Sequence, residues 1–247
     1  MMAQASRPHY RVLFIGNSYT YFNDLPRTLV HFARFAKVSD IETKMIAGGG
    51  MTLKAHWKKG DALKAIRRGG WTHVVLQEQS LLGVSRPKNG ISQIAGPETF
   101  FEHVRKFDAA IKSTGAKTVL YLTWARQNAP ENQRKLNAAY HAMRKELKTI
   151  LIPAGIAWWT ALKKDPALIL YQDDQSHPTP LGTYLVACVF YAAFFKRTPV
   201  GLPRSAFMCG SKNQKSRPVL ISQKDADLIQ WSVQKTLKKI KVGIIKL

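Results

Sequence analysis

The sequence predicts an α/β fold in which helices cover the faces of a parallel sheet of about five strands. Short apolar runs rich in β-branched residues alternate with longer segments whose apolar residues recur at helical spacing. In addition, 45% of the 247 residues are hydrophobic and 21% are charged, which is typical of a folded globular protein and excludes the disordered and collagen-like classes. No repeat or linker interrupts the pattern, so we expect one domain over residues 1–247, with a basic helical extension from about residue 222.

The predicted strands are short and are bounded by turn-forming or helical segments. They lie at residues 10–15, 41–46, 72–76 and 117–122. The last strand is expected at 150–152 and 156–158, with Pro153 interrupting it.

Helices are expected between these strands because their apolar residues recur with a period of about 3.6. Asp24 can cap the first helix, and Pro26 suits its first turn. The remaining helices are expected at residues 53–66, 100–111, 131–147 and 179–195, and the last of them has an almost wholly apolar middle that should be buried against the sheet.

The charge is strongly positive: 38 Lys and Arg stand against 15 Asp and Glu, a net charge of +23. Near the C-terminus, Lys235, Lys238, Lys239 and Lys241 recur beside apolar residues at helical spacing, which predicts a basic helix. Such a surface should concentrate polyanions such as acidic polysaccharide, anionic lipid or nucleic acid. Lysines that are simply solvated are the alternative interpretation.

No motif for a metal or a nucleotide cofactor is found in the sequence. The two cysteines, Cys188 and Cys209, and the seven histidines do not have the spacing of zinc ligands. The chain also lacks a P-loop and a Gly-rich dinucleotide fingerprint. We therefore expect neither a metal nor an organic cofactor.

Membrane and export signals are also missing from the pattern. No apolar run reaches the roughly 18 residues of a transmembrane helix, and residues 1–10 contain no apolar signal-peptide core. The prediction is a cytoplasmic protein, unless the N-terminus is incomplete.

The loops that follow the strands are where a parallel sheet binds its ligands. Gly16-Asn17-Ser18 comes directly after the first strand, where Gly16 permits a tight turn and leaves Ser18 at the sheet edge. A serine there is either a nucleophile or the cap of the next helix.

A second candidate segment is Asp174-Gln175-Ser176-His177-Pro178. A carboxylate three residues before a histidine can accept a hydrogen bond from Nδ1, so that Nε2 faces a hydroxyl group. Asp173, at a spacing of four, could take the same role.

The third candidate is Gly48-Gly49-Gly50-Met51-Thr52. Its glycines let backbone N–H groups turn toward an oxyanion at the start of a helix, and a plain glycine-rich connector is the alternative.

Together these segments resemble the SGNH (GDSL-like) hydrolase superfamily, and within it the DUF4886 branch. The resemblance rests on residues 14–24, 75–80 and 174–178 and extends over most of the chain. It implies a flavodoxin-like three-layer α/β/α sandwich and ester hydrolysis by a Ser-His-Asp triad. By this resemblance Ser18 is the nucleophile, His177 the general base and Asp174 the residue that orients it.

The resemblance further implies an oxyanion hole made by backbone N–H groups of Ser18 and of Gly50, with Gly49 as the alternate. The superfamily usually adds an asparagine from a Gly-x-Asn-Asp block, which this sequence lacks. Gln79, at the end of the third strand, is our substitute because its carboxamide can donate the same hydrogen bond. Gln77 and Asn23 are the alternates.

The candidates for contact with the substrate are Asn23, Gln77 and Trp124. Arg126 lies at the same sheet edge as Trp124. For Trp124, packing in the core is the other interpretation.

We therefore expect a serine esterase that hydrolyses acyl esters through an acyl-enzyme, with O-acetyl esters of carbohydrates as the first choice of substrate. The partner would be a small-molecule or carbohydrate ester, an anionic one included, and not a specific nucleic acid. The alternative function is a catalytically inactive protein of the same fold that binds a polyanion through its basic surface. The sequence leaves the oligomeric state open.

Overall fold

The computed structural model describes residues 9–38, 40–83, 94–208 and 216–241. Its centre is a five-stranded sheet in the order β2-β1-β3-β4-β5, with every neighbouring pair parallel. The strands are β1 (His9–Gly16), β2 (Asp40–Ala47), β3 (His73–Leu76), β4 (Lys117–Tyr121) and β5 (Ile150–Ile152). This strand order is that of the flavodoxin-like class, so the predicted fold is confirmed.

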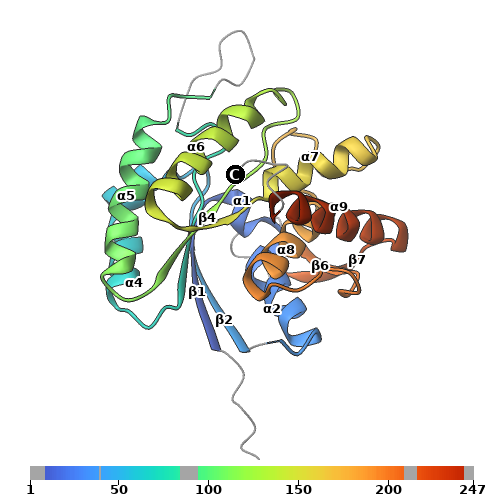
Figure 1. Ribbon diagram of the computed structural model, residues 1–247, viewed down its shortest axis with the longest axis horizontal. Coiled ribbons are helices and arrows are strands. Elements are labelled where there is room, and N and C mark those ends of the chain that lie inside the picture. Colours follow the sequence, from blue (N-terminus) through green and yellow to red (C-terminus); the bar gives the residue numbers. More distant parts are fainter. Residues whose placement is uncertain (1–8, 39, 84–93, 209–215, 242–247) are drawn as a thin grey trace, which may run out of the picture.

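Helices cover both faces of the sheet, giving three layers (Figure 1). One face packs against α2 (Leu25–Phe35), α7 (Ala154–Lys164), α8 (Pro180–Phe195) and α9 (Gln223–Lys241). The other packs against α3 (Leu53–Lys59), α4 (Asp61–Arg67), α5 (Glu98–Lys112) and α6 (Asn132–Leu147).

The strands supply alternate residues to the two cores. In β1, Val12 and Phe14 belong to the core beneath α8, whereas Leu13 and Ile15 belong to the core beneath α5. Successive side chains of a strand point to opposite faces, so a strand covered on both sides must be apolar throughout. The continuous apolar run Val12–Ile15 of β1 meets this requirement, and β1 is an interior strand of the sheet, between β2 and β3.

Two elements differ from the prediction, one in its extent and the other in its type. The helix expected at residues 53–66 is two helices, α3 and α4, because Gly60 ends the first in the left-handed conformation with φ +80°. The second half of the last strand, at 156–158, is instead part of α7, which begins directly after Pro153. Ile156, Ala157 and Trp158 therefore belong to a helix, and they are buried on the side of this helix that packs on the sheet.

A small antiparallel pair was not expected from the sequence. It consists of β6 (Ser205–Met208) and β7 (Arg217–Leu220). Short helices at the serine loop, α1 (Ser18–Tyr21) and η1 (Phe22–Asp24), complete the elements of the described residues. Within this part of the chain, no helix has both the length and the apolar character that crossing a bilayer requires.

Candidate active site

Ser18 is the first residue of α1, just beyond the carboxyl end of the interior strand β1. Asn17 caps this short helix, because its side-chain oxygen accepts a hydrogen bond from the Tyr19 N–H at 3.1 Å. The Asn17 amide nitrogen also donates to the Met51 carbonyl at 3.0 Å. Asn17 thus holds the serine loop against the glycine-rich loop that follows β2.

Gln77 supports the serine loop from beneath. Its Oε1 accepts hydrogen bonds from the Asn17 N–H at 2.8 Å and from the Thr20 hydroxyl at 3.0 Å. A Cβ atom on Gly16 would lie 2.5 Å from the same oxygen, so only glycine permits this close approach. Gln77 is completely buried and does not line the pocket at Ser18. It therefore supports the serine loop and does not make the contact with a substrate that was expected for it.

His177 and Ser18, 159 positions apart in the sequence, meet at the sheet edge: His177 Nε2 lies 2.7 Å from Ser18 Oγ. On the other side of the ring, His177 Nδ1 donates to Asp174 Oδ2. Asp174 Oδ1 accepts the backbone N–H groups of Ser176 at 3.0 Å and His177 at 2.9 Å. The Asp173 side chain makes no hydrogen bond with a described residue. Of the two aspartates, Asp174 is therefore the one that contacts the His177 ring.

The Asp174 carboxylate is stabilised in its ionised form. Burial opposes ionisation, but the hydrogen bond with the His177 side chain and those from the backbone N–H groups of His177 and Ser176 outweigh it, and the pKa of Asp174 is lowered from its ordinary value. An ionised Asp174 holds the proton of His177 on Nδ1. Nε2 is then left with a lone pair that faces the serine hydroxyl.

Tyr19, Trp124 and Ser176 join the serine and histidine loops. The Tyr19 hydroxyl lies 2.7 Å from Ser176 Oγ, and Trp124 Nε1 donates to the Ser176 carbonyl at 3.1 Å. The Tyr19 ring stacks on Trp124 with 4.6 Å between ring centroids, and Trp124 in turn stacks on Trp158 at 4.0 Å. Trp124 is fully buried and does not line the pocket, so it fixes the position of the histidine loop.

Asn23 and Phe22 fix the histidine from the side of η1. The Asn23 amide donates to the Pro178 carbonyl at 2.8 Å and to the Thr183 hydroxyl at 3.1 Å, and only 2% of the residue is exposed. The Phe22 ring stacks on the His177 ring with 4.5 Å between centroids. Asn23 therefore lies behind the histidine loop and does not line the pocket, whereas Phe22 does.

A pocket of about 240 Å³ opens at Ser18 and His177. The residues of the glycine-rich loop that line it are Gly49 and Gly50, and Gly50 has the left-handed φ of +63°. Gln79 lines it as well. Its Oε1 accepts the Leu81 N–H at 2.7 Å, which leaves Nε2 as the donor of this side chain. All three candidate donors of the oxyanion hole, Ser18, Gly50 and Gln79, thus border one pocket.

Glu78 connects the two loops that carry Gly50 and Gln79. Its carboxylate accepts the Leu53 N–H at 3.2 Å, at the start of α3, and the Gln79 N–H at 2.6 Å. Burial raises the pKa of Glu78 to about 7, against the lowering effect of these two hydrogen bonds. No role at the site was expected for Glu78, Tyr19 or Ser176 from the sequence. The only available signal was a charged residue at the end of an apolar strand.

The raised pKa of Glu78 makes a testable contribution to stability. Between the ordinary pKa of a glutamate and about pH 7, the folded chain holds a proton that the unfolded chain has lost, so stability must fall as pH rises through this window. In Glu78→Gln we expect this fall to be smaller than in the parent, by about 2–3 kcal/mol between pH 5 and pH 8. Urea denaturation at both pH values measures the difference.

Glu131→Gln is the matched control, because Glu131 is exposed. It should follow the pH dependence of the parent. A Glu78→Gln variant with that same dependence would show that the buried carboxyl does not titrate in this range.

No cluster of three or more His, Cys, Asp or Glu that could hold a metal ion occurs within the described ranges. The polar groups that border the pocket are hydroxyls, amides, the imidazole of His177 and the guanidinium of Arg126. This set suits an acyl transfer in which protein groups move the proton and bind the oxyanion.

Comparison with solved structures shows which proteins share this fold. A DUF4886 family protein from Bacteroides uniformis is 16% identical with a TM-score of 0.63, and the match covers 94% of this chain and 95% of that chain. A provisionally assigned SGNH hydrolase from Slackia heliotrinireducens is 23% identical with a TM-score of 0.60, covering 75% and 99%. A variant of an acetyl-xylooligosaccharide esterase from Geobacillus is 13% identical with a TM-score of 0.60, covering 77% and 96%.

The sequence matches no family model and no curated protein. The fold is thus that of SGNH hydrolases, including the DUF4886 protein.

Proposed function

We propose that this protein is a serine ester hydrolase that works through an acyl-enzyme. The observation that carries the proposal is the chain of contacts from Asp174 through His177 to Ser18, with 2.7 Å between the last two side chains. A carboxylate, an imidazole and a hydroxyl in this order make the hydroxyl oxygen nucleophilic. The fold shared with SGNH hydrolases supports the same chemistry.

In the first step, Ser18 Oγ attacks the ester carbonyl carbon while His177 Nε2 takes the hydroxyl proton. The carbonyl oxygen becomes an oxyanion, and the N–H groups of Ser18 and Gly50 with the Gln79 amide would bind it. When the tetrahedral intermediate collapses, the C–O bond to the alcohol breaks. His177 returns the proton to the leaving oxygen, and the acyl group remains on Ser18.

In the second step, water attacks the acyl carbon and His177 Nε2 takes a proton from it. Collapse of this intermediate breaks the bond to Ser18 Oγ, which recovers its proton from His177. The products are the free acid and the free alcohol. Asp174 keeps the imidazole in one tautomer throughout and stabilises the imidazolium that forms twice per turnover.

We further propose a short acyl group, with acetyl esters of carbohydrates as the first choice. The pocket volume of about 240 Å³ is below that of typical sites for drug-sized ligands, which supports a short acyl chain. One protein that shares the fold is named as an acetyl-xylooligosaccharide esterase, which supports the choice of acetylated sugar.

Arg126 supports an anionic ester as the better substrate, because its side chain borders the pocket in a chain with a net charge of +23. The Debye length shrinks from about 30 Å at 0.01 M salt to about 8 Å at 0.15 M. We expect kcat/KM for an acetylated uronate to fall over this range. The kcat/KM for a neutral acetylated sugar should stay constant. The release of acetate measures both rates.

Arg126→Gln should reduce the preference for the uronate, and the effect should be largest at low salt. If the two esters had the same salt dependence in the parent protein, the positive surface would not steer substrate to this site.

Hydrolysis of p-nitrophenyl acetate, followed by a series of acetylated sugars, tests the proposed activity. An esterase releases acetate from them with turnover. A catalytically inactive protein that binds polyanions leaves them intact, and that result would favour the alternative function.

A further inference from the structure

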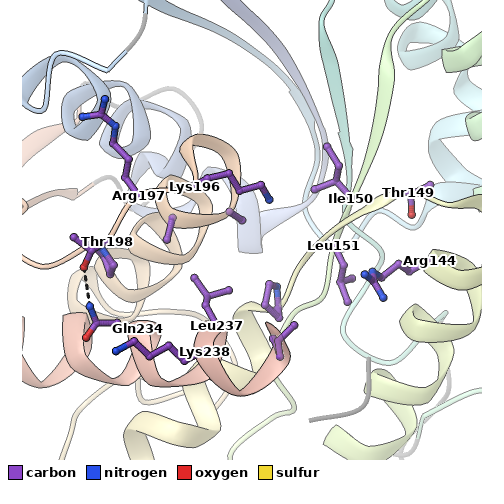
Figure 2. A pocket seen from close by; sticks show the side chains of 15 residues that line it. Arg144, Thr149, Ile150, Leu151, Lys196, Arg197, Thr198, Gln234, Leu237 and Lys238 are labelled. Atoms are coloured by element: carbon purple, nitrogen blue, oxygen red, sulfur yellow. Dashed lines mark hydrogen bonds between the residues drawn. The ribbon is translucent and has the colours of Figure 1, made fainter. Parts of the chain in front are cut away.

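A second cavity, of about 470 Å³, lies beside the edge strand β5. Figure 2 shows its two walls: one carries Arg144, Ile150 and Leu151 from α6 and β5, and the facing wall carries Leu237 and Lys238 from α9. The end of α8 supplies further lining residues. We call this cavity the edge groove. It shares no lining residue with the pocket at Ser18.

The rim of the edge groove is positively charged. Arg144, Lys196, Arg197 and Lys238 line it, and its fifteen lining residues include no Asp or Glu. None of these four cations forms an ion pair with a residue that the structure describes. Cations that line one cavity attract an anion, because no carboxylate among the described residues competes for them.

The walls between the cations are apolar. Ile150 and Leu151 of β5 line one side of the cavity and Leu237 of α9 the other, and the buried residues Ala192 and Ala193 of α8 line it as well. A volume of 470 Å³ lies within the range of about 300–1,000 Å³ that is usual for ligand pockets. An apolar chain placed here would lose its contact with water, which favours binding.

We propose that the edge groove binds a fatty-acid carboxylate, with the carboxylate at the positively charged rim and the alkyl chain between the apolar walls. The apolar walls distinguish this ligand from nucleic acid, which is bound mainly through phosphate contacts and would leave them empty. The concave shape distinguishes it from a membrane surface, which is bound by an apolar face that enters the lipid. This ligand site is separate from the proposed esterase site.

Calorimetric titration of the full chain with octanoate, dodecanoate, octan-1-ol and acetate tests the proposal. We expect dodecanoate to bind more tightly than octanoate because its longer chain buries more apolar surface. Octan-1-ol should bind about tenfold more weakly than octanoate, since it lacks the charge. Acetate should not bind measurably. Equal affinities for octanoate and octan-1-ol would contradict the role of the cations.

The double variant Lys196→Gln/Lys238→Gln locates the site. It should weaken octanoate binding about tenfold, as the loss of two ion pairs predicts. Lys235→Gln/Lys239→Gln is the matched control: it removes the same charge, but neither residue lines the edge groove. Equal weakening in both double variants would show that only the net charge matters and would overturn the proposal, as would no weakening in either.

A chain that ends at Lys241 tests whether residues 242–247 occupy the edge groove instead. If the full chain failed to bind octanoate while the shortened chain bound it, the occupant would be this segment, and the proposal would be wrong. Binding of octanoate by both chains with the same affinity supports a fatty-acid ligand.

Discussion

Replacing Ser18 by alanine should reduce kcat for p-nitrophenyl acetate by about 10³-fold or more, because only the oxyanion donors and substrate binding then remain. The fold should be preserved, since Ser18 lies at the start of a four-residue helix whose cap is supplied by Asn17. Initial rates at saturating substrate measure the effect. The urea midpoint shows whether the variant is folded.

Ser80→Ala is the matched control for this variant. Ser80 lines the same pocket, and its hydroxyl hydrogen-bonds with the side chains of Arg126 and Tyr19 and not with that of His177. Its replacement removes one hydroxyl from the pocket and should leave kcat within a few-fold of the parent. If Ser18→Ala kept the activity of the parent, or if Ser80→Ala lost as much, Ser18 would not be the nucleophile.

Asp174→Asn should lower kcat by about 10³–10⁴-fold with little change in KM. The asparagine side chain is the same size but can offer an N–H to His177 Nδ1, which would favour the tautomer with its proton on Nε2. The serine hydroxyl would then face a donor where it needs an acceptor. Steady-state kinetics with p-nitrophenyl acetate separate the two constants.

Asp173→Asn provides the control, because Asp173 is adjacent and exposed. The structure gives its side chain no hydrogen bond with a described residue, so its variant should behave as the parent. A large loss of kcat in Asp173→Asn with none in Asp174→Asn would assign the orienting role to the other aspartate.

The sequence was sufficient to predict the fold class because the strands are covered on both faces. Such strands need continuous apolar runs, and residues 12–15 and 119–122 are runs of this kind. The break at Gly60 has a local cause, a glycine that ends α3 in the left-handed conformation. The helical state of residues 156–158 depended instead on tertiary packing. An apolar segment after a proline suits either a strand or a buried helix, and periodicity over three residues cannot separate the two.

The segments that make up the candidate site could also be predicted, because the loops after parallel strands meet at one edge of the sheet. The roles of Asn23, Gln77 and Trp124 could not. Each was a candidate for substrate contact, and the structure instead places each of them behind the pocket, in contact with the serine or histidine loop. Polar side chains near a site look alike in sequence whether they face the substrate or support the residues that do.

The central claim is that Ser18, activated by His177, is acylated during turnover. The most direct test is mass spectrometry of the protein after incubation with a fluorophosphonate, which reacts with an activated serine and leaves the organophosphonyl group on its oxygen. We expect one equivalent of adduct on the intact parent protein, located on Ser18 by peptide analysis, and none in Ser18→Ala. An unmodified parent protein, or an adduct that persists in Ser18→Ala, would contradict the claim.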